Sequence, residues 1–343
     1  MLPALGASGR STTGDHAARN VMHKAVKRAL TAEEIQTYRR DGVVLVRELI
    51  DPDWVTELQQ LVDQNIVQPS RMVRDINEPG GTGNFFGDTF VCHHIAGFRS
   101  FIFDSPAADV VCACMGSSRT NLIFDQILAK EPGTSTRTTW HQDAPYWPVA
   151  GDMIATVWVA LDPVSYDTGA VEYVKGSHRW GKRFAAVSFS PGETYHEALE
   201  PVPDIDSQRD AYDFACFEMV PGDCTIHHGL TVHGAPGNSS SRVRRRAYIT
   251  RWAGEDVRYN PRPNLQRMLH DPDIKAGQRL DCDLFPVVRE GLAKRGFDYF
   301  SRHGQRIWTE SRIIVQTVQS NHLIRADLEI ENIRVLYDSC GIT

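Results

Sequence analysis

The sequence lacks three features that would each indicate a particular class of protein. It has no run of about 18 apolar residues, so we expect no membrane-spanning helix. Basic residues are not in excess, because 37 Lys and Arg stand against 43 Asp and Glu, with a formal net charge of −6. Non-specific phosphate binding gains no support, and we expect no nucleic-acid partner. Internal repeats are also absent, so the 343 residues fit one large domain or two smaller ones.

The cysteines show no disulfide or metal-binding pattern. Seven are present, an odd number, and no CxxC pair occurs. Since no secretory signal is visible either, we expect reduced thiols and a cytoplasmic location. Residues 1–28 are rich in Ser, Thr, Gly and Arg and contain a single acid, Asp15, so a disordered tail is expected there. An organellar transit peptide is the alternative for this stretch.

The first third of the chain has helical character. Thr31 and Glu34 form a capping-box pattern, and Pro52 stands at the first position of a second predicted helix. The predicted elements are a helix at 31–40, a strand at 43–49, a helix that begins at 52, a loop at 77–88 and a helix at 105–117.

After residue 119 short apolar strands alternate with turns that contain Pro, Gly and Asp. The predicted strands are 121–130, 153–164, 170–178, 214–220, 224–229, 231–234 and 244–252. Helices that precede the strands argue against a doubly wound sheet and favour a mainly β fold with flanking helices, a sandwich or jelly roll. We expect one domain at 29–290, followed by a charged extension at 291–343 that packs on it as helices or an edge strand.

The stretch "TWHQDAPYWPV" contains a histidine and an acid two residues apart. On a strand, residues i and i+2 point to the same face, so His141 and Asp143 would project together. One imidazole and one carboxylate make up two thirds of the facial triad that holds non-haem Fe(II). The third ligand is then a histidine from a distant strand: His233 is the best candidate, with His227 and His228 as alternatives. A hydrogen-bonded histidine at a strand end is the competing interpretation of His141.

The order of motifs resembles the phytanoyl-CoA dioxygenase family of Fe(II)/2-oxoglutarate oxygenases. "WHQDAPYWPV", "TGAVEYVKGSHRWG" and "HGAPGN" carry the resemblance, which runs from about residue 31 to about 290. It implies a double-stranded β-helix, a cupin-like jelly roll, in which His141, Asp143 and His233 bind iron. The resemblance also places His228 near the distal ligand, where it would orient a ligand by a hydrogen bond.

The resemblance further implies an arginine for the far carboxylate of 2-oxoglutarate, about a dozen residues after the distal histidine. Arg244 has the common spacing and is slightly preferred. Strand alternation instead puts Arg245 on the more apolar face, so both remain candidates. Gln126 and Trp158 match positions that contact the cosubstrate in relatives.

The implied reaction is hydroxylation of a small molecule with O₂, releasing succinate and CO₂. Because Asp143 is a carboxylate, hydroxylation or a related oxidation such as desaturation is favoured over halogenation. Tyr146, Trp147, Asn84 and Phe85 are the predicted substrate contacts, on loops at the mouth of the jelly roll. We expect a monomer or homodimer. Two alternatives remain: a non-catalytic jelly-roll binding protein, and a zinc hydrolase that uses the same ligands.

Overall fold

The structure is a computed structural model that describes residues 28–189, 199–263 and 265–291. The chain divides into two units, residues 1–292 and 293–343. Apart from residues 28 and 291, the predicted N-terminal tail and C-terminal extension lie outside the described residues. None of the described helices combines the length and apolar character needed to cross a membrane.

Four α-helices lie in the first third of the chain, and their ends follow local sequence chemistry. Thr31 and Glu34 form the predicted capping box: the backbone N–H of Glu34 donates to Thr31 Oγ1 over 3.1 Å, and that of Thr31 donates to Glu34 Oε2 over 2.7 Å. The α-helices are α1 (Ala32–Asp41), α2 (Pro52–Val67), α3 (Ala96–Asp104) and α4 (Ala107–Met115). Short 3₁₀ helices are η1 (Val91–His93), η2 (Ala144–Tyr146), η3 (Tyr166–Thr168), η4 (Ser177–Arg179) and η5 (Asp206–Ala211).

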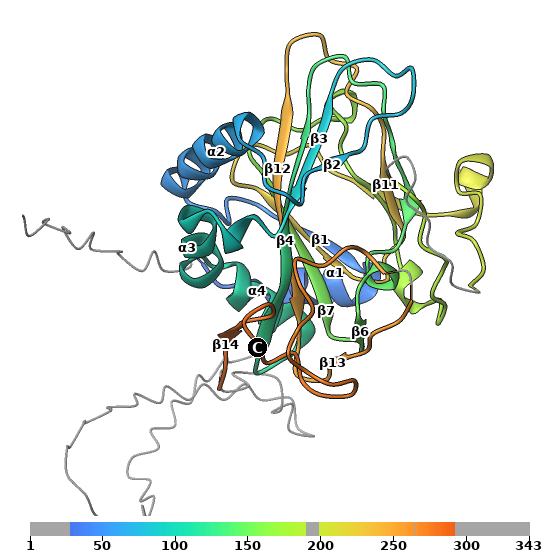
Figure 1. Ribbon diagram of the computed structural model, residues 1–343. Helices are drawn as coiled ribbons and strands as arrows, with labels where there is room; N and C mark the ends of the chain where they lie inside the picture. Colours follow the sequence, from blue (N-terminus) through green and yellow to red (C-terminus); the bar gives the residue numbers. More distant parts are fainter. Residues whose placement is uncertain (1–27, 190–198, 264, 292–343) are drawn as a thin grey trace, which may run out of the picture. The chain divides into compact units, whose positions relative to one another are not determined.

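The strands form antiparallel sheets (Figure 1). The large sheet has the order β1 (Val43–Val46), β10 (Cys224–His228), β7 (Ile154–Ala160), β12 (Arg245–Ala253), β4 (Thr120–Lys130), β3 (Phe85–Thr89) and β2 (Arg74–Asp75), and β14 (Val287–Arg289) also pairs with β4. A second sheet has the order β5 (Thr138–His141), β11 (His233–Ala235), β8 (Glu172–Val174) and β9 (Phe214–Cys216), and β13 (Arg258–Tyr259) pairs with β6 (Val149–Ala150). The predicted mainly β class is confirmed.

The predicted loop at 77–88 is wrong at its C-terminal end. Phe85 pairs with Lys130, and the strand continues to Thr89 along the edge of β4. Three of the four glycines that suggested a loop lie at residues 80–83, whereas Gly87 is within the strand, and Phe85 is buried. Long-range pairing with β4 therefore extends the sheet beyond the local turn pattern.

The two faces of the large sheet pack against different partners. On the outer face, Val157, Ile226 and Tyr248 belong to one apolar core with residues of all four α-helices (Figure 1). On the inner face, Trp158 and Ile249 form a separate apolar cluster and line a cavity that residues of the second sheet also line. Strand alternation thus decides which side chains enter the cavity.

Candidate metal centre and its cavity

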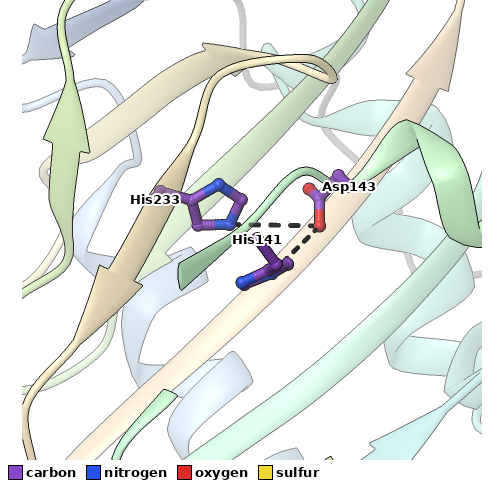
Figure 2. A group of neighbouring side chains, drawn as sticks. All are labelled: His141, Asp143 and His233. Carbon is purple, nitrogen blue, oxygen red and sulfur yellow. Dashed lines mark ion pairs between the residues drawn. The ribbon is translucent and has the colours of Figure 1, made fainter. Parts of the chain in front are cut away.

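Two histidines and one aspartate converge between the two sheets (Figure 2). His141 ends β5, and it pairs directly with His233, which begins β11. Each of the three side chains offers one ligand atom, and these atoms lie within 4.8 Å of one another. The Nε2 atoms of His141 and His233 lie 3.7 and 4.0 Å from Asp143 Oδ1. The structure therefore brings together the three residues that the sequence proposed as ligands.

Asp143 reaches this position through a turn and not through strand alternation. β5 ends at His141, and Asp143 has helical backbone angles (φ −73°, ψ −48°) at the start of η2. The expectation that the strand would continue through Asp143 is wrong, although the two side chains do converge.

Hydrogen bonds orient both histidine rings. The Nδ1 atoms of His141 and His233 lie 2.7 and 2.9 Å from the carbonyl oxygens of Thr139 and Thr231. A carbonyl oxygen only accepts, so each Nδ1 carries the proton and each Nε2 presents a lone pair. Burial, together with the nearby His141 and His227, holds the pKa of His233 well below its ordinary value. A neutral ring with a free Nε2 is the form that binds a metal ion.

The two oxygens of Asp143 have different surroundings. Oδ2 accepts a 2.8 Å hydrogen bond from Thr156 Oγ1 and lies 3.2 Å from His227 Nε2. Oδ1 faces the two histidine Nε2 atoms. Burial raises the pKa of Asp143, but the charge of Arg251, followed by hydrogen bonds with His141 and His227, outweighs it and holds that pKa well below its usual range. Asp143 is therefore an anion that presents Oδ1 to a cation.

The expectation that His228 assists the metal ligands does not fit its position. Adjacent strand residues face opposite ways, so His227 points into the cavity while His228 points outward. His228 Nε2 bonds to the carbonyl oxygen of Asp152 over 2.8 Å, and its ring lies beside His178 on the outer side of the sheet. His227, which the sequence offered as an alternative metal ligand, instead contacts Asp143.

The two candidate arginines have different environments. Arg244 forms ion pairs with Asp63 and Glu131 and does not line the cavity. Arg245 lines the cavity, is 2% exposed, and forms no ion pair with a carboxylate among the described residues. Burial lowers the pKa of Arg245 to about 10, so it stays charged at neutral pH. Motif spacing favoured Arg244, which lies outside the cavity. Strand alternation favoured Arg245, which is buried and lines the cavity.

Gln126 and Trp158 both line the cavity, as the resemblance implied. The guanidinium carbon of Arg245 lies 5.5 Å from the centre of the Trp158 ring. Gln126 Oε1 accepts a 2.7 Å hydrogen bond from Arg251 Nη2. Sequence reasoning missed Arg251, although the alternation that turns Arg245 inward continues through it.

The cavity has a volume of about 340 Å³. Three predicted substrate contacts line it, namely Tyr146, Trp147 and Phe85, and both Tyr146 and Trp147 also belong to an apolar core cluster. Asn84 does not line it, because its Oδ1 accepts from Asn77 Nδ2 over 3.3 Å at the surface. Phe189, not predicted, stacks on Tyr146 and covers an edge of His141.

The donor set fits Fe(II): two imidazole Nε2 atoms and one carboxylate oxygen converge from one side, which is the pattern of non-haem iron oxygenases. In the same cavity Arg245 is a buried cation with no ion-pair partner among the described residues, as the distal carboxylate of 2-oxoglutarate requires. These side chains hold their positions through contacts with Thr139, Thr231, Thr156 and Trp158.

Comparison with known proteins agrees with this geometry. The chain is similar to the multifunctional dioxygenase prhA of Penicillium brasilianum, with 25% identity over 63% of this chain and 70% of the relative. It is also similar to ectoine dioxygenase of Bordetella bronchiseptica, with 26% identity over 74% and 86%. Four other curated relatives match over 43–51% of their own length.

The fold also matches solved structures. The non-haem α-ketoglutarate-dependent carbocyclase SnoK from nogalamycin biosynthesis superposes with a TM-score of 0.63 at 21% identity, over 76% of this chain and 96% of SnoK. This likeness confirms the predicted jelly roll. The family model for phytanoyl-CoA dioxygenase matches residues 38–247. The chain therefore belongs to the phytanoyl-CoA dioxygenase family, and its chemistry is that of an Fe(II)- and 2-oxoglutarate-dependent dioxygenase.

Proposed function

We propose that His141, Asp143 and His233 bind the iron and that the protein hydroxylates a small molecule in the adjoining cavity. When bound, Fe(II) with 2-oxoglutarate and O₂ supplies the oxidising chemistry and releases succinate and CO₂. The observation that carries the assignment is the convergence of two free Nε2 atoms and Asp143 Oδ1 on one point. Because Asp143 occupies a ligand position, oxidation without halogen transfer is expected.

Arg245 is the residue that binds the far carboxylate of 2-oxoglutarate in this proposal. It is buried, charged and without an ion-pair partner among the described residues, and a guanidinium in this state favours a bidentate carboxylate. Trp158 covers one side of that position, and Gln126 lines the cavity nearby. Arg244 already has two carboxylate partners and is assigned a structural role.

The remaining walls exclude water and position the substrate. Tyr146 and Phe189 stack beside His141, with ring centres 5.6 Å apart. The Tyr146 hydroxyl donates to the carbonyl oxygen of Val187 and accepts from its N–H, both over 2.8 Å. This pair of bonds holds the backbone at Val187, so that Phe189, two residues further along, is kept against the ring of His141. An apolar cover of this kind strengthens the electrostatic interactions beneath it.

The test is to titrate the Fe(II)-loaded protein with 2-oxoglutarate without oxygen and to follow the visible charge-transfer absorption. We expect Arg245→Met to weaken 2-oxoglutarate binding about 100-fold, or ~2.7 kcal/mol, because a buried charged hydrogen bond is lost. Arg244→Met is the matched control and should bind as the wild type does. The opposite ranking would transfer the assignment to Arg244.

A zinc hydrolase is the second candidate, because the same three ligands suit Zn(II). It leaves Arg245 without a function, since hydrolysis needs no dicarboxylate cosubstrate. A protein that binds zinc, develops no absorption with Fe(II) and 2-oxoglutarate, and releases no succinate would favour this candidate and overturn the proposed function.

A further inference from the structure

The cavity carries more positive charge than iron and 2-oxoglutarate require. Its charged lining consists of four arginines and two carboxylates, namely Arg74, Arg137, Arg245, Arg251, Glu78 and Asp143. Fe(II) and the 2-oxoglutarate dianion carry equal and opposite charges, so loading both leaves the positive excess unchanged. Arg137 is exposed and pairs with Asp206 over 3.2 Å, which accounts for one of the arginines at the cavity rim. The buried arginines of the lining are Arg245 and Arg251.

Arg251 is a buried cation whose hydrogen-bonding capacity is incompletely used. It is 7% exposed, and its Nη2 donates to Gln126, but Nε and Nη1 have no hydrogen-bond partner within residues 28–189, 199–263 and 265–291. The rings of Phe124 and Trp147 hold the guanidinium, with its carbon 4.5 and 5.7 Å from their centres. Gln266, 9% exposed, also lines the cavity, and its Nε2 has no hydrogen-bond partner in the described part of the chain. Buried donors without acceptors are destabilising, so a bound acceptor is expected.

Asp143 does not satisfy Arg251. Arg251 Nε lies 3.9 Å from Asp143 Oδ2, which is beyond hydrogen-bonding distance, and that oxygen already accepts from Thr156. Burial lowers the pKa of Arg251, the charges of Asp143 and Asp125 raise it, and the charge of Arg74, which also lines the cavity, lowers it further.

We propose that the primary substrate is a small organic acid whose anionic group binds Arg251, with Gln266 as an additional donor. The inference rests on the proposed function and adds the class of its substrate. Because Arg251 lies so close to Asp143, an acid bound there places its charge beside the metal. The carbon that is oxidised therefore lies within a few bonds of the acid group.

The size of the cavity limits the rest of the substrate. About 340 Å³ is at the small end of the range for ligand pockets, and 2-oxoglutarate occupies part of it. The walls beyond Arg251 are aromatic, formed by Tyr146, Trp147 and Phe189. A short apolar chain on the acid fits this space.

The probes that test the inference are acetate, propionate and butyrate, each paired with its neutral amide. They are added without oxygen to the protein loaded with Fe(II) and saturating 2-oxoglutarate, and the shift of the charge-transfer band is measured. We expect the acids to shift the band and the amides to require at least about tenfold higher concentrations. Arg251→Met should abolish the response to acids, and Arg244→Met, which removes a charge outside the cavity, should retain it.

Three results would overturn the inference: no shift with any acid, equal shifts with acids and amides, or a response that survives Arg251→Met. A fourth is that Arg251→Met weakens 2-oxoglutarate binding as strongly as Arg245→Met does, which would assign Arg251 to the cosubstrate. If the band never forms, the proposed function fails. Thermal unfolding of the apoprotein then decides on the anion site, where acids should still stabilise Arg245→Met but not Arg251→Met.

Discussion

Arg244 and the arginines of strand β12 project to both faces of the large sheet. The arginines on the two faces differ in whether carboxylates of the protein neutralise their charge. Outside the cavity, Arg246 makes two hydrogen bonds to Asp162 and an ion pair with Asp63, and Arg244 shares Asp63. Inside it, Arg245 and Arg251 are also buried, but neither has a carboxylate at hydrogen-bonding distance among the described residues. The outer arginines are neutralised by carboxylates of the protein, and their ion pairs with Asp63 join α2 to the sheet. We propose that the charges of the inner arginines are neutralised by bound ligands.

Strand β10 shows the same contrast with histidines. His227 faces inward and contacts the Asp143 carboxylate, and His228 faces outward and bonds to a backbone carbonyl. Burial lowers the pKa of both rings, and that of His228 reaches about 4. Of two adjacent histidines, one therefore contacts a proposed metal ligand on the inner face, and the other bonds to the backbone on the outer face.

We expect the largest effect from replacing Asp143, the carboxylate among the three proposed metal ligands. Asp143→Ala removes the anion from the metal site, so we expect no succinate formation above background in assays with Fe(II), 2-oxoglutarate and O₂. Asp63→Ala is the matched loss of an outer carboxylate. Both arginines that contact Asp63 keep another partner, so its succinate formation should persist and its stability should change by less than about 1 kcal/mol. Full turnover by Asp143→Ala would disprove the ligand assignment.

A smaller effect is expected at Asp125, a carboxylate on the outer face of the sheet, whose replacement should change the stability of the fold. Burial raises the pKa of Asp125 to about 6, against opposing hydrogen bonds from Tyr248 and Cys92. Between the usual Asp pKa of about 4 and this value, the folded state binds more protons than the unfolded state, so this group's stabilising contribution falls as pH rises through that window.

Asp125→Asn removes this titration. In urea unfolding, the stability of the variant relative to the wild type should increase between pH 4 and pH 7, by about 3 kcal/mol at most. Parallel pH profiles for the two proteins would show that Asp125 titrates as an ordinary carboxyl group.

The smallest expected effect compares the two neighbouring histidines directly. His227→Ala removes a group that orients the Asp143 carboxylate, and loss of such a contact weakens metal affinity about 10- to 100-fold. His228→Ala should leave Fe(II) affinity within about threefold of the wild type, because it contacts no ligand. Competition with a chromogenic chelator measures both affinities. Equal losses in the two variants would remove the distinction between the faces.

Much of the site was predictable from local patterns. The pair His141 and Asp143 stands in one short motif, and the "HGAPGN" stretch supplies His233. The capping box at Thr31 and most strands were also predictable, because turn residues and apolar alternation are local properties. The start of β3 at Phe85 was not, since its pairing with β4 depends on residues 45 positions away.

The sequence proposed Arg244, His228 and Asn84 for the site, whereas none of the three lines the cavity, because their side chains face away from it. The alternation along "RVRRRAYITRW" is visible in the sequence. Local spacing does not show which of the two alternating sets of side chains faces the cavity. A shift of one residue reverses every side chain, and long-range pairing settles the phase, here Arg245 with Lys130 and Ile249 with Trp158.

The sequence by itself determined the chemistry of this protein: the ligand types, their order along the chain, and a supply of arginines for anionic cosubstrates. The tertiary structure decided that Arg245 and His227, and not Arg244 and His228, face the cavity. It also decided that Arg251 enters the cavity with Gln126 as its hydrogen-bond partner and with no carboxylate at hydrogen-bonding distance among the described residues. The physical reason is that residue identity is local, whereas burial and the pairing of charges depend on strands that meet across the fold.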